Sequence, residues 1–155
     1  MEERFMQLAI DLAKENVKSQ KGGPFGAVIV KEGDIISMAS NSVTATHDPT
    51  AHAEINAIRK ACLELNTIDL SGCHIYTSCE PCPMCLGAIY WAKISKIYYA
   101  CSRQDAENAG FNDKWIYKEL GLELSRRSIP SFALLKDKGL EALKLWNDSP
   151  MKIPY

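Results

Sequence analysis

Apolar side chains recur with two different periods in the first part of the chain. Between residues 2 and 19 they recur every three or four positions, with lysine and glutamate side chains opposite them, and this spacing predicts an amphipathic helix. Two short runs rich in β-branched residues follow at 25–30 and 35–39. Residues 31–34 between them are polar and include a glycine, so we predict a β-hairpin.

The same periods predict the next elements. Asp48 is of a residue type that favours a helix N-cap, and a proline follows it, so we predict a helix over 49–65. Strands are predicted at 73–78 and 96–101, with a helix over 81–92 between them. The order α-β-β-α-β-α-β predicts an α/β fold in which helices cover one mixed sheet.

Beyond the last predicted strand the pattern is weaker. We expect a polar loop at 102–113 and a short helix at 114–120. Residues 122–135 contain a proline and favour no single element, whereas 139–147 fits a last helix. The tail 149–155 holds two prolines and is expected to be extended.

Composition narrows the class of protein. A chain of 155 residues with 46% hydrophobic residues is long enough to bury one core, so we predict a single domain over 1–155. The net charge of −1 argues against a nucleic-acid partner, because such proteins concentrate Lys and Arg. No apolar run is long enough for a membrane span. Residues 1–4 are charged and unlike a signal peptide, so we expect a cytoplasmic protein with free thiols.

The candidate chemistry lies in two short motifs. His52-Ala53-Glu54 and Pro81-Cys82-Pro83-Met84-Cys85 together form H-x-E…P-C-x-x-C, a signature of zinc deaminases that act on nucleobases. The predicted helix from 51 to 65 is about 22 Å long, and a strand from 73 to 79 is about 23 Å long. If the strand runs antiparallel to the helix, the chain returns to its starting level and two helix N-termini converge.

The number of ligands distinguishes a catalytic from a structural zinc. His52, Cys82 and Cys85 give three ligands and leave a fourth position for water, which is the catalytic arrangement. Glu54 is then available to carry protons. Two alternatives use Cys79: a closed Cys3His zinc site, and an iron–sulfur cluster on the C-x2-C-x2-C spacing. The second lacks the expected fourth cysteine, since position 89 is isoleucine.

With these residues in hand, the chain resembles the cytidine deaminase-like superfamily, and within it the bacterial guanine deaminases. The resemblance covers nearly the whole chain. The superfamily motifs lie at 22–30, 48–54 and 76–92, whereas 109–113, 116–119 and the terminal Tyr155 resemble the guanine deaminases.

The resemblance implies a three-layer α/β/α sandwich that hydrolyses guanine to xanthine and ammonia. It implies one Zn²⁺ per subunit and a homodimer that exchanges C-terminal segments, about 136–155. The implied site residues, by role, are the zinc ligands His52, Cys82 and Cys85; the catalytic Glu54 and Asp113; the base-binding Asn41 and Ala53 backbone; the ring walls Phe25 and Trp91; and Tyr155, entering the partner's site.

Several simpler interpretations stay open at this point. Asn41 is also a common turn residue, Phe25 and Trp91 could pack in the core, and Asp113 could be an N-cap. Chain ends usually fray, which applies to Tyr155. The competing functions are deamination of adenosine in tRNA, deamination of cytosine or another aminated heterocycle, and a non-enzymatic structural zinc module.

Overall fold

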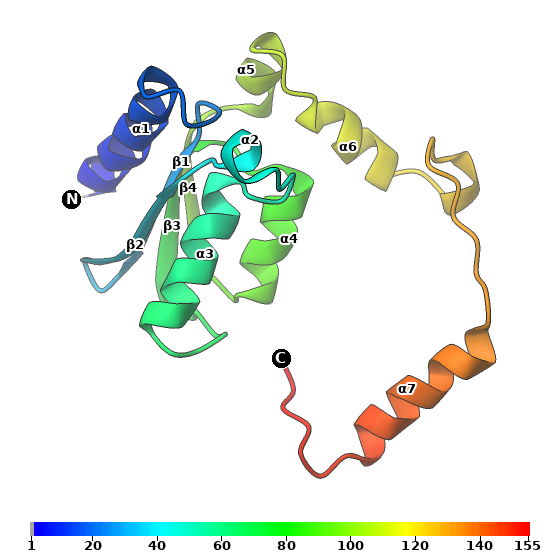
Figure 1. Cartoon of the computed structure of the whole chain (residues 1–155). Helices are drawn as coiled ribbons and strands as arrows, with labels where there is room; N and C mark the ends of the chain where they lie inside the picture. Colours follow the sequence, from blue (N-terminus) through cyan, green and yellow to red (C-terminus); the bar gives the residue numbers. More distant parts are fainter. Residues whose placement is uncertain (1) are drawn as a thin grey trace. The chain divides into compact units, whose positions relative to one another are not determined.

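The computed structural model describes residues 2–155, which form two compact units. The first unit ends at Tyr117 and the second spans Lys118–Tyr155. The elements, labelled in Figure 1, are α1 (Glu2–Lys18), β1 (Gly26–Lys31), β2 (Asp34–Ser40), α2 (Val43–Thr46), α3 (Ala53–Glu64), β3 (Cys73–Cys79), α4 (Pro83–Trp91), β4 (Lys96–Cys101), α5 (Arg103–Asn108), α6 (Asp113–Leu120), η1 (Leu124–Arg126) and α7 (Lys136–Asp148).

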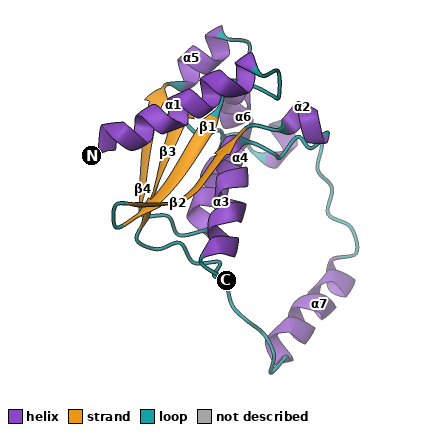
Figure 2. Cartoon of the chain, turned by 60° about the vertical axis from the view of Figure 1, so that its left-hand side comes forward, coloured by secondary structure: helices purple, strands orange, loops and turns teal. Residues whose placement is uncertain are grey.

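The first unit is built on a four-stranded sheet with the order β2-β1-β3-β4. β1 is antiparallel to both β2 and β3, whereas β3 is parallel to β4, so the sheet is mixed as predicted. α1 covers one face of the sheet, and α3 and α4 cover the other (Figures 1 and 2). This arrangement confirms the predicted three-layer α/β/α fold.

The central strand β1 is almost continuously apolar because helices cover both faces of the sheet at this strand. Ala27 and Ile29 belong to the core beneath α3 and α4, whereas Val28 and Val30 pack with Phe5 of α1 on the opposite face. Successive side chains of a strand point to opposite faces, so a strand covered on both sides has no polar positions. Burial on two faces is what fixes β1 in the middle layer.

Two glycines do what other residues could not at their positions in the fold: one has a positive φ in a turn, and the other allows a helix to approach a strand closely. In the hairpin, Glu32 and Gly33 both have positive φ, 52° and 92°, which is the conformation of a two-residue turn that matches strand twist. The predicted hairpin is therefore confirmed. At Gly26, a Cβ atom would lie 2.2 Å from the carbonyl oxygen of Ala9, so only glycine lets α1 lie this close to β1.

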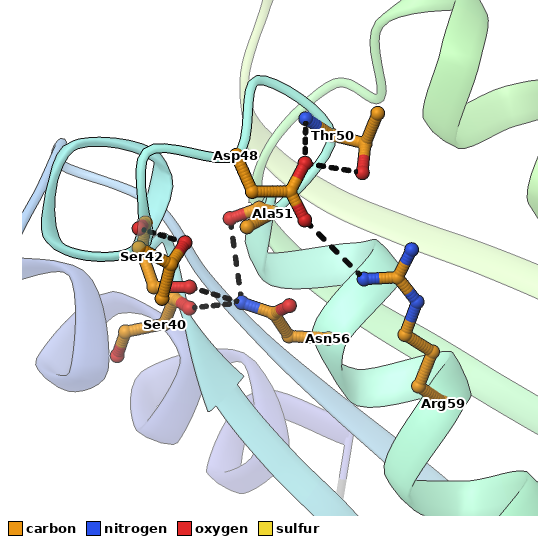
Figure 3. Close-up of polar contacts among 8 residues, drawn as sticks. Ser40, Ser42, Asp48, Thr50, Ala51, Asn56 and Arg59 are labelled. Carbon is orange, nitrogen blue, oxygen red and sulfur yellow. Dashed lines mark hydrogen bonds and ion pairs between the residues drawn. The ribbon is translucent and has the colours of Figure 1, made fainter.

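The predicted start of the helix over 49–65 was wrong. Asp48 does not cap a helix; its Oδ1 accepts hydrogen bonds from the backbone N–H of Thr50 at 2.8 Å and from the Thr50 hydroxyl at 2.7 Å (Figure 3). Such a local Asx turn uses the same side chain that an N-cap would use. α3 instead begins at Ala53, with His52 as its N-cap.

The predicted polar loop at 102–113 contains a helix, α5. Ser102 accepts a hydrogen bond from the backbone N–H of Asp105, and the Asp105 carboxylate accepts one from the backbone N–H of Ser102. This reciprocal capping box starts a helix without an apolar period. The prediction missed it because Arg103–Asn108 carries almost no apolar side chains.

The second unit contains the end of α6, the 3-10 turn η1 and α7. The predicted helices at 114–120 and 139–147 are confirmed as α6 and α7. The carboxylate of Glu119 accepts hydrogen bonds from the backbone and hydroxyl of Ser128, which orders the chain between them. No helix of residues 2–155 is long and apolar enough to cross a membrane. The single domain over 1–155 stays a prediction.

Candidate active site

Two helix starts bring the predicted metal ligands together. His52 is the N-cap of α3 and Cys82 is the N-cap of α4, and both have an extended backbone with ψ of 157° and 168°. Pro83 occupies the first position of α4, where its missing N–H costs nothing. Cys85 lies in the first turn of the same helix. The convergence of helix N-termini inferred from element lengths is thus present in the fold.

The three donor atoms are spaced as a zinc ion requires. The Nδ1 atom of His52 lies 3.6 Å from the Sγ of Cys82 and 3.5 Å from the Sγ of Cys85. All three donor atoms lie within 4.8 Å of one another. A tetrahedral zinc with ordinary bond lengths places a nitrogen and a sulfur ligand about 3.6 Å apart. The residues therefore fit the metal without rearrangement.

The electrostatics of this pair of cysteines favour a cation. Hydrogen bonds from the Cys85 thiol and from His52 lower the pKa of Cys82 to about 4. The same hydrogen bond, with burial, raises the pKa of Cys85 well above its usual range. The contact with Cys82 raises the pKa of His52. A thiolate at the N-terminus of α4 is also stabilised by the helix dipole.

Glu54 lies beside these donors and is almost fully buried. Only 7% of its surface is exposed, and that burial raises the pKa of its carboxyl to about 7. A carboxyl group with such a pKa both accepts and releases a proton near neutral pH, as a general acid–base group does. The residue is the second of α3, so the extended backbone at His52 allows both side chains to face one point.

A cavity of about 240 Å³ opens over the donors. It is smaller than the roughly 300–1,000 Å³ of pockets that hold drug-sized ligands, so a free base suits it. Its lining residues come from both sides of the metal motifs and are Gly23, Phe25, Asn41, Val43, Thr44, His52, Glu54, Cys79, Glu80, Cys82, Phe111 and Asp113.

Asn41 lines this pocket with its amide in a fixed orientation. Its Oδ1 accepts hydrogen bonds from the backbone N–H groups of Val43 at 3.2 Å and Gly23 at 3.4 Å. Its backbone carbonyl accepts another from Asn16 at 2.8 Å. Because Oδ1 is engaged, the NH₂ group of the amide is the donor that remains for a ligand in the pocket.

One wall of the pocket is a pair of aromatic rings. Phe25 and Phe111 contact edge to face, with centroids 4.7 Å apart and planes at 77°. Phe25 was predicted as a ring wall, whereas Phe111 was not singled out. The signal available for Phe111 was one aromatic residue within a polar stretch. Asp113, two residues later, also lines the pocket. Burial raises the pKa of its carboxyl, and the nearby charge of Cys82 raises it further.

Three predicted substrate residues do not line this pocket. Ala53 is fully buried, with its side chain in the core below the sheet, and a backbone contact to the base stays a prediction. Trp91 ends α4 and is 68% exposed. Tyr155 belongs to the second unit. Roles for Trp91 and Tyr155 at the substrate stay predictions.

Two other lining residues bear on the ligand count. Cys79 lines the cavity, but it is outside the three-residue donor cluster found among residues 2–155. Its Sγ donates to the carbonyl of Ser102 at 3.6 Å, and burial raises its pKa to about 12. Both observations oppose the closed Cys3His alternative. The carboxylate of Glu80 is paired with Arg103, so among residues 2–155 Glu54 and Asp113 are the lining carboxylates with no salt bridge to a lysine or arginine.

The side-chain amide of Asn56 links the residues around Asn41 to the residue before the metal ligand His52. The Nδ2 of Asn56 donates to the Ser40 carbonyl at 3.0 Å, the Ser42 hydroxyl at 3.0 Å and the Ala51 carbonyl at 3.3 Å (Figure 3). Ser40 and Ser42 flank Asn41, and Ala51 precedes His52. Asn56 therefore fixes the loop that carries both functional side chains.

An open three-donor site beside a buried carboxylate, at converging helix ends of an α/β/α sandwich, defines a hydrolytic metal centre. Residues 1–101 match the family described as "Cytidine and deoxycytidylate deaminase zinc-binding region". The chain belongs to this family of zinc-dependent deaminases.

Individual relatives extend the similarity beyond that region. The chain is 49% identical to guanine deaminase of Bacillus subtilis (strain 168), covering 99% of this chain and 98% of that protein. The crystal structure of that enzyme superposes with a TM-score of 0.95. A tRNA-specific adenosine deaminase of Aquifex aeolicus (strain VF5) is 48% identical over 63% of this chain and 64% of its own length. The structure of NE0047 in complex with 2,6-diaminopurine has a TM-score of 0.67 and 31% identity, covering 97% of this chain and 84% of that chain.

Proposed function

We propose that this protein is a zinc-dependent guanine deaminase, which converts guanine and water to xanthine and ammonia. The observation that carries the proposal is the pocket itself. Two carboxylates, Glu54 and Asp113, and the aromatic pair Phe25 and Phe111 line it together with the donors His52 and Cys82. The near full-length similarity to the guanine deaminase of Bacillus subtilis supports the same substrate.

The chemistry assigns a role to each carboxylate. His52, Cys82 and Cys85 would hold the zinc ion, which when bound supplies Lewis-acid activation of the attacking water. Glu54 accepts a proton from that water and delivers it to a ring nitrogen of the base. Glu54 next takes the remaining proton of the hydroxyl group now bonded to the ring carbon and transfers it to the amino group. The C–N bond then breaks, ammonia leaves, and the hydroxyl oxygen becomes the new carbonyl of xanthine. Asp113 assists proton transfer at this amino group, and its raised pKa suits that task.

The remaining lining residues orient the base. The NH₂ group of Asn41 donates a hydrogen bond to an acceptor of the purine, and the backbone at Ala53 provides a second polar contact. Phe25 packs against the ring plane, with Phe111 completing that wall. Aromatic rings of this kind bury a flat heterocycle and leave its polar edge to directed hydrogen bonds. Trp91 and Tyr155 are assigned to the outer wall and to closure of the site.

The second candidate is deamination of adenosine in tRNA, favoured by the similarity to the Aquifex enzyme. That substrate needs a basic surface for phosphate contacts. The net charge of −1 shows no excess of lysine and arginine from which to build such a surface. Cytosine is a smaller base and would leave part of the aromatic wall unused. A non-enzymatic zinc module would have no use for a buried carboxylate beside its metal, because burying one is costly.

We further propose a homodimer in the cytoplasm, with segments of about 136–155 exchanged and one zinc per subunit. Within the second unit, none of the apolar side chains of α7 is buried. The helical spacing of Leu140, Leu143 and Trp146 places these side chains along one face of α7, so a partner surface would cover one continuous apolar stripe. All six cysteines are free thiols, which suits a reducing compartment.

The metal-dependent reaction is tested by following conversion of guanine to xanthine by absorbance. We expect activity to be lost on treatment with a chelator and restored by added zinc. His52→Asn should lose both bound zinc and activity. The matched variant His47→Asn, at a left-handed position that asparagine tolerates, should keep both. Full activity of His52→Asn would refute the assignment of the metal site.

A further inference from the structure

The segment between β4 and the end of the first unit contributes two groups to the pocket. Phe111 provides half of the aromatic wall, and Asp113 provides a second carboxylate besides Glu54. Both lie outside the family-wide region, which ends at residue 101. Their value to the reaction depends on how the segment 102–117 is held against the metal centre.

One attachment lies at the start of this segment. The Nε of Arg103 donates to Oε1 of Glu80 at 3.0 Å, and its backbone N–H donates to Oε2 at 3.0 Å. Both carboxylate oxygens are therefore engaged by one residue, an arrangement more specific than a single ion pair. The backbone N–H of Glu80 also donates to the carbonyl of Cys101 at 2.8 Å. The loop before Cys82 and the start of α5 are thus joined by side-chain and backbone hydrogen bonds.

The other attachment lies at the end of the segment. The hydroxyl of Tyr117 donates to the carbonyl of Pro81 at 2.8 Å. Pro81 is buried and directly precedes the metal ligand Cys82. The guanidinium of Arg103 lies 4.1 Å from the centroid of the Tyr117 ring, so the two attachments contact each other. Such a cation–π contact stabilises both side chains in one arrangement.

These attachments are not needed to form the helices of the segment. α5 has its own capping box between Ser102 and Asp105. Lys114 of α6 bonds to Gln104 and Glu107 of α5 at 3.2 and 3.1 Å. What Arg103 and Tyr117 add is a fixed position for Phe111 and Asp113 relative to the metal ligands.

We propose that Arg103 and Tyr117 are positioning residues that fasten segment 102–117 to Glu80 and Pro81, and so hold Asp113 and Phe111 in register with the metal centre. The inference rests on the proposed function, because it assigns these residues to purine deamination. It makes Tyr117 act through Asp113, and this dependence is measurable.

The test is a double-mutant cycle on the zinc-loaded enzyme, with Tyr117→Phe, Asp113→Asn and the combination. Tyr117→Phe removes only one hydroxyl and should lower kcat/KM for guanine about fivefold, as loss of one hydrogen bond does. In the Asp113→Asn background the same change should cost less than about twofold, since coupled residues are not additive. Equal losses in both backgrounds would overturn the proposal. Tyr98→Phe is the control, because its hydroxyl also makes one hydrogen bond, to Glu2 at 2.7 Å.

A second readout needs no substrate. Hydrogen–deuterium exchange of peptides from 103–117 should accelerate in Tyr117→Phe and Arg103→Lys, while β1 and β2 keep their protection and zinc content is unchanged. Tyr98→Phe should leave the segment unaffected. Unchanged hydrogen–deuterium exchange of peptides 103–117 in both variants would refute the anchoring, whichever nucleobase is the substrate. Inactivity of the wild-type enzyme toward guanine would instead refute the proposed function, and the exchange data would still decide the anchors.

Discussion

The Nδ1 atom of His52 lies 3.5 Å from the Sγ of Cys85, although 33 residues separate them in the sequence. The distance depends on two helix starts, because His52 caps α3 and Cys85 lies in the first turn of α4. Glu54 follows His52 by two residues and is buried at the same place. The convergence of the starts of α3 and α4 therefore positions both the metal donors and the proton carrier Glu54.

Glu54→Gln should separate catalysis from metal binding. The amide is of equal size but cannot carry a proton, so we expect kcat to fall by about 10³-fold or more, near the upper range for general acid–base groups. Zinc content, measured by elemental analysis, and the melting temperature should be retained. The control is Glu64→Gln on the exposed end of the same helix, with unchanged activity. Loss of zinc or unfolding in Glu54→Gln would mean that Glu54 has a structural role.

Asn41→Asp should weaken binding of the base. A carboxylate can still accept the hydrogen bonds from Val43 and Gly23, but it has no NH₂ group to donate. We expect kcat/KM for guanine to fall by about 10- to 100-fold, through loss of one hydrogen bond and an unpaired acceptor on the base. Steady-state kinetics measures this effect. Asn66→Asp, exposed in the turn just after α3, is the control. Equal kinetics of the two variants would contradict a substrate contact at Asn41.

The sequence was sufficient for the parts of the site that depend on local spacing. His52, Glu54, Cys82 and Cys85 follow from two motifs and from element lengths. The position of Asp48 was misjudged because an Asx turn and an N-cap use the same residue types. α5 was missed because its stability comes from the Ser102 capping box and not from an apolar period.

Other parts of the site depend on side-chain directions that no periodicity encodes. Phe111 lies in the pocket because the turn between α5 and α6 points it at Phe25. The loop around Asn41 is ordered by Asn56, which is 15 residues away in sequence and donates to the Ser40 carbonyl, the Ser42 hydroxyl and the Ala51 carbonyl. Such convergence is a property of tertiary packing, and the pattern of apolar residues contains no trace of it.

The ion pair of Glu80 and Arg103 should make stability depend on pH. The hydrogen bond from Arg103 holds the pKa of Glu80 below its ordinary value of 4.5. A lowered folded-state pKa stabilises the protein above the ordinary value, and this stabilisation is lost as pH falls through the folded-state pKa. Glu80→Gln should therefore lower the melting temperature at pH 7 by about 2–4 °C, corresponding to about 1 kcal/mol for a half-exposed pair.

Calorimetry as a function of pH checks this expectation. The difference between wild type and Glu80→Gln should shrink below pH 4.5 and vanish below the folded-state pKa. The exposed Glu123→Gln serves as the control, with no difference at any pH. A difference that is constant from pH 7 to pH 2 would show that the charge of Glu80 is not the cause.

Removal of Pro154 and Tyr155 tests the proposed closure of the site by the C-terminal tail. We expect kcat for guanine to fall by at least about tenfold, since an open site admits water and leaves the substrate less ordered. The melting temperature should change by no more than a few degrees. Tyr155→Phe keeps the ring and should retain most activity. A deletion variant with the wild-type rate would refute this role of the tail, and light scattering of the wild type and both variants would report whether each forms the proposed dimer.

The central claim is that the pocket acts on a free purine, and ammonia release from a panel of substrates tests it most directly. The zinc-loaded protein would be offered guanine, adenine, cytosine, cytidine and a tRNA anticodon stem-loop under identical conditions. The account predicts that guanine releases ammonia at least about 100-fold faster than any other member, since a site built to hydrogen-bond one base rejects analogues that leave its polar groups unpaired. Release from the stem-loop with none from guanine would contradict it.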